Sequence, residues 1–485
     1  MNHRMVGRFL SLIVLTEAIF MLPAWLISLA HGEMKGAWAF AVTIVATILA
    51  SVFVLLICRK AQIKFYAREG LVCVGLGWII MSFVGCMPFL LSGEIPNFID
   101  AYFETVSGFT TTGASILTDV EAMGKGMLYW RSFTHWLGGM GVLVFLLAVV
   151  PASGKGSGFT MHLLRAESPG PNVGKLVPRM RQTAMILYLL YLALTVLCFL
   201  FLLFGGMSPF EAICTAYGTA GTGGFGVKND SIAGYSVYIQ NVCTVFMLLF
   251  GVNFTCYYLL LLGRLKDVFK DEELRLYIGL IVSSIVIISI NTRGMFSSLG
   301  ETVQQVAFQV ATIITTTGFA TTDFDLWPTF SKAILVILML CGASAGSTGG
   351  GFKCGRVLLL MKNLKRNLQK TLNSQKILVV RNNGQMVNEK VLSNLNTYLI
   401  AYVFITIASF LVVCLDGESL TTSMTSVIAC VNNIGPGLDG VGPTKNYHMF
   451  SDMSKVVLIL DMLAGRLEIF PIMLLFSRNT WRKLV

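Results

Sequence analysis

The stretch ATIITTTGFATTDF, residues 311–324, is an apolar run with helical character that ends in three threonines and a glycine. A close copy, SGFTTTGAS, occupies residues 107–115. Two further segments have the same form, EAICTAYGTAGTGGF at 211–225 and SMTSVIACVNNIGPG at 423–437. A search for internal repeats therefore finds four copies, and the alignment brings together Gly113, Gly223, Gly318 and Gly435.

The composition is that of an integral membrane protein. Of the 485 residues, 55% are hydrophobic and 13% are charged, and the mean hydropathy is +0.73, whereas soluble domains average about 25% charged residues. A membrane-crossing helix needs roughly 20 apolar residues. We predict ten such spans, the first of them retained rather than cleaved as a signal peptide, at about 9–30, 37–58, 71–92, 127–151, 183–206, 237–263, 274–291, 330–361, 394–415 and 453–477.

The distribution of positive charge predicts the orientation of these spans. Of the 36 Lys and Arg residues, 27 fall in the segments that ten spans would place on one side. By the positive-inside rule this side is the cytoplasm, and both termini lie in it. The net charge of +11 therefore indicates topology, and we do not interpret it as a sign of nucleic-acid binding.

Each repeated segment predicts a short helix, a loop and a return to another span. Non-helical backbone at membrane depth persists only where it is buried in protein or lines a water-filled path. Four short helices with their C-terminal ends turned to one axis would attract a cation, and carbonyl oxygens would replace its hydration shell. The hydroxyls of Thr110–Thr112 and Thr315–Thr317 either coordinate the ion or support the loop from behind. The alternative is that these small residues serve only helix packing.

The chain resembles the TrkH family, the membrane subunits of the bacterial Trk and Ktr potassium-uptake systems. The segments SGFTTTGAS, GTAGTGGFG, TTTGFATTDF and NNIGPGL look like that family's four filter loops. The resemblance implies an all-α membrane protein with ten transmembrane helices. Four pseudo-repeats of span, pore helix, filter loop and span would surround one pore, after an N-terminal helix pair.

These implications divide the chain into six parts. They are the N-terminal helix pair at 1–70, pore repeat 1 at 71–182, pore repeat 2 at 183–273, pore repeat 3 with its gating loop at 274–375, a cytoplasmic hairpin at 376–390 and pore repeat 4 at 391–485.

By the same resemblance, three residues in each loop coordinate K⁺ as a selectivity filter. They are Thr111, Thr112 and Gly113; Gly221, Thr222 and Gly223; Thr316, Thr317 and Gly318; and Asn433, Ile434 and Gly435. The fourth loop departs from the pattern, because asparagines stand where the first and third loops have threonines, and Pro436 follows the glycine. We expect an asymmetric filter with relaxed selectivity.

The predicted span 330–361 is interrupted by GASAGSTGGG, residues 342–351. Each glycine costs a helix about 1 kcal/mol relative to alanine, so we expect a flexible loop here. The resemblance implies that it gates the pore, and the alternative is a close helix crossing that needs small residues. The proposed gating residues are Gly346, Ser347, Thr348, Gly349, Gly350, Gly351 and Arg466.

Arg466 lies inside the last predicted span, where an arginine at the bilayer centre costs about 2.5–3.5 kcal/mol. Neither Asp461 nor Glu468 stands four residues away to face it along the helix. The resemblance places this charge beneath the filter, where it would oppose cation passage, and the alternative is a structural ion pair. We expect Lys455, near the start of the same span, at the membrane interface.

The segment KILVVRNNGQMVNEKV, residues 376–391, has two β-prone runs around Asn383–Gly384 and predicts a hairpin with a type I′ turn. With the basic stretch at 362–370 it would offer a docking face. The family's partner is TrkA, a cytosolic nucleotide-binding regulatory subunit, although anionic lipid headgroups would also attract these lysines.

The sequence therefore predicts K⁺ uptake across the bacterial inner membrane through a gated, K⁺-preferring pore, with a homodimer implied by the family. GTGGFG at 221–226 lacks the βαβ context of a dinucleotide site and GSTGGGFK lacks the P-loop ending, so we expect no nucleotide on this chain. No catalytic grouping indicates an enzyme. The alternative is a secondary transporter that couples K⁺ to H⁺ or Na⁺ through Glu17, Asp461 and Glu468.

Overall fold

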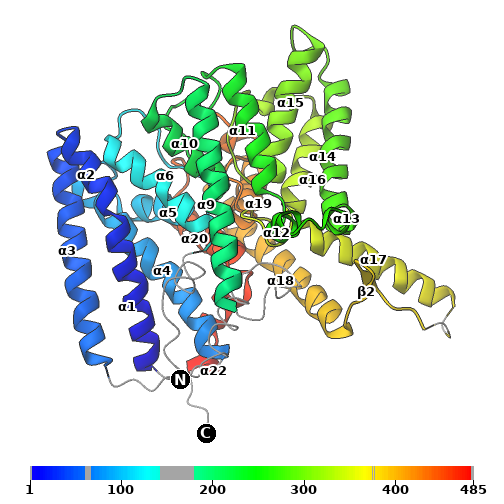
Figure 1. The fold of residues 1–485 in the computed structure, drawn as a ribbon, viewed down its shortest axis with the longest axis horizontal. Helices are drawn as coiled ribbons and strands as arrows, with labels where there is room; N and C mark the ends of the chain where they lie inside the picture. The colour runs from blue at the N-terminus through cyan, green and yellow to red at the C-terminus, as the bar shows by residue number, and fades with distance from the viewer. Residues whose placement is uncertain (1–2, 60–66, 142–179, 374, 376, 482–485) are drawn as a thin grey trace.

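The computed structural model describes residues 3–59, 67–141, 180–373, 375 and 377–481. It is a mostly helical, membrane-type protein (Figure 1). Three helices at the N-terminus, α1 (His3–Phe20), α2 (Leu22–Ala30) and α3 (Met34–Ile57), pack together at one side of the molecule. The remainder of the chain begins with α4 (Ala67–Ser92), which packs against α1 and α3.

Four short helices follow four long ones along the chain. The long helices are α4, α9 (Met180–Phe204), α14 (Glu272–Asn291) and α18 (Glu389–Val413). The short helices are α5 (Phe98–Phe109), α10 (Pro209–Gly221), α15 (Leu299–Ile314) and α19 (Leu420–Val431). Each short helix begins at a polar side chain that accepts a hydrogen bond from its first turn, which fixes where the helix starts. These caps are Asn97, Ser208, Ser298 and Ser419.

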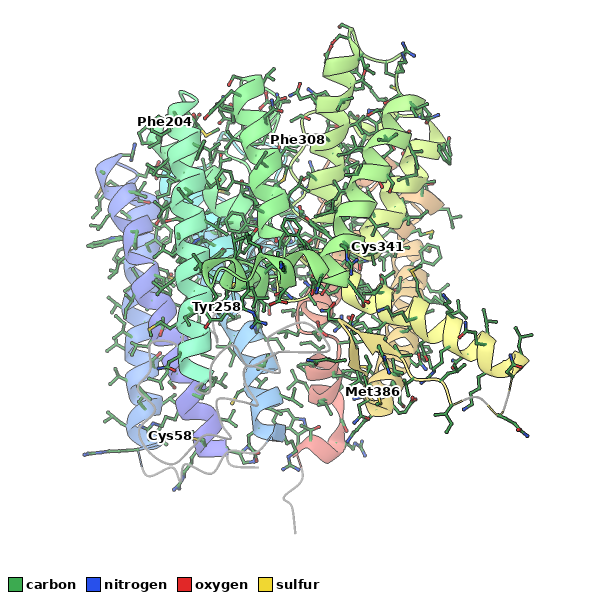
Figure 2. All side chains as sticks on the ribbon, turned by 45° about the vertical axis from the view of Figure 1, so that its right-hand side comes forward. Cys58, Phe204, Tyr258, Phe308, Cys341 and Met386 are labelled. Carbon is green, nitrogen blue, oxygen red and sulfur yellow. The ribbon has the colours of Figure 1, made fainter. Side chains whose placement is uncertain are left out.

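The helices that follow the loops are shorter than the sequence predicts. They are α6 (Lys125–Gly139), α11 (Val237–Phe250), α16 (Thr329–Cys341) and α20 (Asp452–Arg466), and the longest has 15 residues. A break after α11 turns the chain by 88° into α12 (Phe254–Leu261), which carries Tyr258 across the ends of the upright helices (Figure 2). Another break separates α20 from α21 (Phe470–Phe476), where Glu468 and Ile469 both have a positive φ.

The sequence predicted a break only at 342–351. That break is present, between α16 and α17 (Cys354–Leu372), but the two helix breaks inside the predicted spans 237–263 and 453–477 were not predicted. Both breaks were missed because their residues, Gly251–Asn253 and Leu467–Ile469, do not form a cluster of glycines. The end of the predicted span 127–151 lies outside the described residues.

Six helices in the described part of the chain are long and apolar enough to cross a membrane, and the bent pair α11–α12 makes up to seven. The other three predicted spans contain the shorter helices α6, α16 and α20. Length and composition therefore establish a multi-pass membrane type of chain, while the exact number of ten crossings stays a prediction.

On the side away from α1–α3, α17 and a small hairpin project from the helical body (Figure 1). The hairpin pairs β1 (Arg381–Asn382) with β2 (Gln385–Met386) around Asn383 and Gly384, both of positive φ, as the predicted turn requires. The remaining elements are short: α13 (Leu265–Lys270), α22 (Arg478–Trp481), η1 (Phe324–Leu326), η2 (Cys414–Asp416) and η3 (Asp439–Val441).

Candidate functional site

The four loops that follow the short helices share one backbone conformation. We call them loop 1 (110–114), loop 2 (221–225), loop 3 (315–319) and loop 4 (432–436). Each holds one non-glycine residue in the left-handed region, with φ between 53° and 59°: Thr111, Thr222, Thr316 and Asn433. Two residues later each holds a glycine with φ between 78° and 94°: Gly113, Gly224, Gly318 and Gly435. A threonine in this region is strained, so the surrounding structure must enforce it.

The hydrogen bonds of the loops repeat as well. In every loop the residue between the two left-handed positions donates its N–H to the carbonyl oxygen five residues earlier. These bonds are Thr112 to Ser107 at 2.9 Å, Gly223 to Gly218 at 2.9 Å, Thr317 to Thr312 at 2.8 Å and Ile434 to Ala429 at 2.9 Å. Each loop is thereby tied to the last turn of its own helix.

This geometry corrects the alignment of loop 2. The sequence placed Gly223 beside Gly113, but the residue with the equivalent φ is Gly224. Thr222 and Gly223 keep equivalents among the predicted filter residues of the other loops. Gly221, the last residue of α10 and the first of loop 2, is equivalent to Thr110, Thr315 and Asn432, which the sequence did not place in the filter. The error arose because Gly223 and Gly224 are adjacent, and the sequence alone does not tell which of them adopts the left-handed conformation.

The four loops also contact one another in a closed ring. A Cβ atom on Gly113 would overlap the carbonyl oxygen of Gly223, one on Gly224 that of Thr317, and one on Gly318 that of Ile434. On Gly435 it would lie 2.7 Å from the carbonyl oxygen of Thr112, which closes the ring. Only glycine permits such an approach of backbone to backbone. Four equivalent carbonyl groups, from Thr112, Gly223, Thr317 and Ile434, therefore meet around one centre.

Several threonine hydroxyls support the loops from within the protein. Thr110 Oγ1 donates to Val106 O at 2.7 Å and lies 2.8 Å from Thr112 Oγ1. Loop 3 repeats this pattern, since Thr315 Oγ1 donates to Ala311 O at 2.6 Å and lies 2.8 Å from Thr317 Oγ1. The sequence left the role of these hydroxyls open. All but one of the six bond to protein atoms, whereas Thr111 Oγ1 is buried and has no hydrogen-bond partner within the described part of the chain.

Loop 4 replaces hydroxyls by amides. Asn432 Nδ2 donates to Ile428 O at 2.9 Å and to the hydroxyl of Tyr402 at 2.8 Å. Asn433 Nδ2 donates to Thr112 Oγ1 at 2.9 Å, so loop 4 is joined to loop 1 by a side chain. The two asparagines that depart from the repeat therefore stabilise loop 4 through hydrogen bonds from their amide groups, as the threonine hydroxyls do in loops 1 and 3.

The segment between α16 and α17, residues 342–353, is named here the glycine loop, and it lies directly against loops 3 and 4. The N–H of Gly350 donates to Thr316 Oγ1 at 2.6 Å. A Cβ on Gly350 would lie 2.6 Å from the carbonyl oxygen of Asn432, and one on Gly349 would lie 2.9 Å from that of Thr315. The glycine loop thus covers the C-terminal ends of α15 and α19.

The break between α11 and α12 receives the other side of the glycine loop. The backbone N–H of Thr348 and its Oγ1 both donate to Phe250 O, at 3.4 and 3.2 Å. Ser344 N–H donates to Gly251 O at 3.1 Å, and Phe254 N–H donates to Gly346 O at 3.0 Å. The broken helix end supplies carbonyls that a continuous helix would have used internally.

A carboxylate from α14 holds both ends of the glycine loop. Glu273 Oε1 accepts hydrogen bonds from the N–H groups of Ala345 at 2.6 Å and Gly355 at 2.9 Å. Next to it, Glu272 pairs with Lys362 and accepts the N–H of Asn383 at 3.2 Å. The start of α14 therefore contacts the glycine loop on one side and the turn of the hairpin on the other.

Arg466 joins the end of α20 to two other segments. Its guanidinium donates to Thr348 O at 2.9 Å, to Gly139 O at 2.7 Å and to Gly138 O. It therefore links the glycine loop to the end of α6. The neighbouring Glu468 forms an ion pair with Arg356 of α17.

The structure gives Lys455 a buried partner, and its expected place at the membrane interface stays a prediction. Its side chain is buried in the protein, where Nζ lies 2.6 Å from Asp100 Oδ1 on α5. The ion pair joins α20 to α5, two helices that are far apart in the sequence, and it explains how a lysine is accommodated in the protein interior.

The three intramembrane carboxylates singled out from the sequence lie on different helix pairs. Glu17 of α1 is buried close to Gly85 of α4, and within the described part of the chain neither of its oxygens has a hydrogen-bond partner. Asp461 of α20 accepts from Ser409 of α18 at 2.7 Å. Together with Glu468 at the α20–α21 break they do not form one chain of contacts among the described residues.

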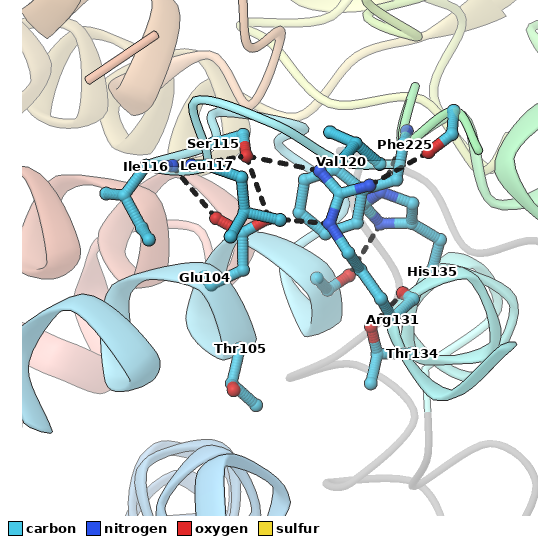
Figure 3. Close-up of polar contacts among 12 residues, drawn as sticks. Glu104, Thr105, Ser115, Ile116, Leu117, Val120, Arg131, Thr134, His135 and Phe225 are labelled. Carbon is cyan, nitrogen blue, oxygen red and sulfur yellow. Dashed lines mark hydrogen bonds and ion pairs between the residues drawn. The ribbon is translucent and has the colours of Figure 1, made fainter. Parts of the chain in front are cut away.

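Two residues of α6, Arg131 and His135, connect α5 with the end of loop 2 and the residue after it, and sequence analysis missed both roles (Figure 3). Arg131 pairs with Glu104 at 2.6 Å and also donates to Gly226 O at 3.0 Å and Ser115 Oγ at 3.2 Å. His135 lies 2.8 Å from Gly108 O and 3.2 Å from the amide N of Phe225. The sequence did offer a signal for Arg131, because a charged residue inside an apolar run indicates a buried polar contact.

In the segment between α19 and α20, Asp439 follows loop 4 and accepts hydrogen bonds from the hydroxyls of Ser419 and, at 2.9 Å, Thr422. These bonds stabilise the carboxylate form and lower the pKa of Asp439. The residue thus ties the segment after loop 4 to the N-terminus of α19.

Comparison with known proteins gives a consistent result. The family model of the cation transport protein TrkH matches residues 37–483. The Trk system potassium uptake protein TrkH of Escherichia coli K12 is 35% identical over 490 residues, with both chains covered completely. TrkH of Vibrio parahaemolyticus is 32% identical, with 99% of this chain and 100% of the relative covered.

A solved structure agrees with these relatives. The crystal structure of the potassium transporter TrkH from Vibrio parahaemolyticus superposes with a TM-score of 0.89 at 29% identity. The superposition covers 99% of this chain and 100% of that one. The likeness therefore extends over the whole fold as well as the sequence.

Proposed function

The chain belongs to the TrkH family of cation transport proteins, and from this premise we propose that it takes up K⁺ across the bacterial inner membrane through a gated, K⁺-preferring pore. The relatives named above are potassium uptake proteins, which makes this chain an ion transporter rather than an enzyme. The observation that carries the proposal is the closed ring of loops 1 to 4, in which four equivalent carbonyl groups meet.

The physical argument concerns dehydration. Transfer of an ion of this size from water to a medium of low dielectric constant costs on the order of 20 kcal/mol, so oxygen atoms must replace the hydration shell. In our proposal the backbone of each loop supplies them, and the negative C-terminal ends of α5, α10, α15 and α19 add to the attraction. With loop 2 in its corrected register, the coordinating residues are Thr111–Gly113, Thr222–Gly224, Thr316–Gly318 and Asn433–Gly435.

The proposed architecture is four pseudo-repeats of span, short helix, loop and span around one pore, with ten crossings in all. The common φ angles and hydrogen bonds of the four loops support this arrangement. So does the order of long, short and broken helices along the chain.

We propose that the glycine loop closes the pore. Its contacts with loops 3 and 4 support this role, because the ion would leave the filter at the ends of α15 and α19. Arg466 would hold the closed position through Thr348 O and would place a positive charge below the filter. Opening would require these hydrogen bonds to break together.

The regulatory partner in this proposal is a cytosolic nucleotide-binding subunit of the TrkA type. The hairpin and the basic face of α17 would receive it, and the contacts of Glu272 with the hairpin and of Glu273 with the glycine loop support a connection from this face to the gate. Both termini would then lie in the cytoplasm, and the protein would act as a homodimer.

A second candidate is secondary transport, with K⁺ entry coupled to H⁺ or Na⁺. The observation in its favour is that, among the described residues, Glu17 and Asp461 are buried carboxyl groups with at least one oxygen that has no hydrogen-bond partner. Such groups inside a membrane are candidates for proton binding. Their location on separate helix pairs favours the pore.

Reconstitution into liposomes separates the two candidates. We expect K⁺ flux that follows the K⁺ gradient alone and that is enhanced by the cytosolic partner. Flux that stops when the proton or sodium gradient is removed, at a constant K⁺ gradient, would replace the pore by a coupled transporter. Empty liposomes and liposomes with Gly318→Ser serve as controls.

A further inference from the structure

Loop 2 lacks a side chain at a position where the other three loops have one. The middle residue is Thr112 in loop 1, Thr317 in loop 3 and Ile434 in loop 4, but Gly223 in loop 2. The φ of Gly223 is not positive, so the backbone conformation does not require glycine here. A neighbouring group that fills the space of a side chain would explain why this position is glycine.

That group is the imidazole of His135 from α6. A Cβ atom on Gly223 would overlap the ring, with Nδ1, Cγ and Cδ2 of His135 as its nearest neighbours. The ring therefore stands where the side chain of a loop residue would begin. The carbonyl oxygen of the same Gly223 lies against Gly113 in the ring of loops, so the imidazole lies directly behind one of the four converging carbonyl groups.

The two nitrogens of His135 bind backbone groups of two segments, the end of α5 and loop 2. Nδ1 lies 2.8 Å from Gly108 O, in the last turn of α5, and Nε2 accepts the N–H of Phe225 at 3.2 Å (Figure 3). The carbonyl requires a donor and the amide requires an acceptor. The ring is therefore the neutral tautomer with its proton on Nδ1.

The surroundings restrain the ring and loop 2 together. The Phe225 ring lies 4.1 Å from the His135 ring, centroid to centroid, and the Arg131 guanidinium lies 3.5 Å from the centre of Phe225. Arg131 is fixed in turn by Glu104 and by Gly226 O. The segment after Gly224 is thereby held between two side chains of the same helix.

We propose that His135 is a positioning residue for loop 2 and, through the Gly223 carbonyl, a determinant of ion selectivity. The imidazole of α6 takes the place of the missing loop side chain, and it constrains a glycine pair that would otherwise have wide conformational freedom. This inference rests on the proposed function, because it assigns a role within the proposed filter.

The first test is a double-mutant cycle between positions 135 and 223. Gly223→Thr alone should collide with the ring, and His135→Ala alone should leave the loop unsupported, so each should lower the K⁺ over Na⁺ permeability ratio about tenfold. The double variant gives loop 2 the threonine of loops 1 and 3 in a vacated space and should recover most of the ratio. If Gly223→Thr lowers the permeability ratio equally in the wild type and in the His135→Ala variant, the proposal is overturned.

The second test separates the hydrogen bonds from the volume of the ring. His135→Phe keeps a ring but removes both bonds, and we expect a lower permeability ratio with K⁺ flux retained. His135→Asn can still donate near the Nδ1 position and His135→Gln can accept near Nε2, so each should fall between wild type and His135→Phe. A His135→Phe protein with the wild-type ratio contradicts the proposal.

The control is His448→Ala, at an exposed histidine outside the loops, which should leave the ratio unchanged. Thermal unfolding of the same purified variants measures the energetic coupling between positions 135 and 223, as the non-additivity of their effects on stability, without any measurement of ion flux. If wild-type protein carries no K⁺, the proposed function fails, while the presence or absence of this coupling still decides whether His135 positions loop 2.

Discussion

The backbone N–H of Gly350 donates a 2.6 Å hydrogen bond to Thr316 Oγ1. One bond thus connects the glycine loop to the residue of loop 3 that holds the strained left-handed conformation. Movement of the glycine loop must break this bond and expose the hydroxyl. The proposed gate and the proposed filter are therefore in direct contact, with no intervening element between them.

Gly318→Ser should lower the K⁺ over Na⁺ permeability ratio. The φ of Gly318 is 89° and its Cβ would overlap the carbonyl oxygen of Ile434, so a side chain must displace loop 3 or loop 4. Ion-replacement flux in liposomes measures the ratio. Gly300→Ser, at an exposed glycine near the start of the same helix α15, is the matched control, and equal ratios for both variants would remove Gly318 from the filter.

Arg466→Ala should raise K⁺ flux in the absence of the regulatory partner. The substitution removes the bonds to Thr348 O and Gly139 O and the positive charge. Arg466→Lys keeps the charge but cannot form the same set of bonds. Its flux therefore separates the effect of the positive charge from the effect of the hydrogen bonds. Arg293→Ala, at an exposed arginine, is the control. Flux as low as that of wild type would leave Arg466 with a structural role only.

Glu273→Ala should loosen the glycine loop at both ends, because one carboxylate oxygen holds the N–H groups of Ala345 and Gly355. We expect faster hydrogen exchange at residues 342–353 and higher basal flux. Glu418→Gln, at an exposed acid, serves as control. Unchanged exchange in the glycine loop would show that its other contacts suffice to hold it.

Lys455→Met and Asp100→Asn should each destabilise the protein by about 3–5 kcal/mol, since each leaves a buried partner without its ion pair. The double variant, which removes both charges, should be more stable than either single one. Thermal unfolding in detergent, followed by loss of the monodisperse peak, measures the difference. Simple additivity of the two losses would mean that the two side chains of the 2.6 Å pair are not energetically coupled.

Acid should weaken the tie between Asp439 and α19. Hydrogen bonds from Ser419 and Thr422 lower the pKa of Asp439, so the unfolded chain binds more protons than the folded one between the two pKa values. This contribution to stability is complete above the ordinary aspartate pKa of about 3.9 and is lost as the pH falls through the folded value. Asp439→Asn should flatten the pH dependence of unfolding in this acid range, and an unchanged profile would exclude the effect.

The sequence by itself determined the elements that repeat. The four short helices, the glycine at the end of loops 1, 3 and 4 and the break at 342–351 follow from local composition, because apolar length and glycine act over a few positions. The hairpin around Asn383–Gly384 is equally local. The assignment of the loops to ion coordination came from the repeat and from the family resemblance.

The tertiary structure decided what depends on contacts between distant segments. It selected Gly224 over Gly223, because only a neighbouring loop and the ring of His135 distinguish two adjacent glycines. It buried Lys455 beside Asp100, 355 positions away, and it broke α11 where the glycine loop donates hydrogen bonds to the freed carbonyl groups of Phe250 and Gly251. Local sequence limits the conformations that a segment can adopt. Contacts with segments that are distant in the sequence, which form only on folding, then select one of them.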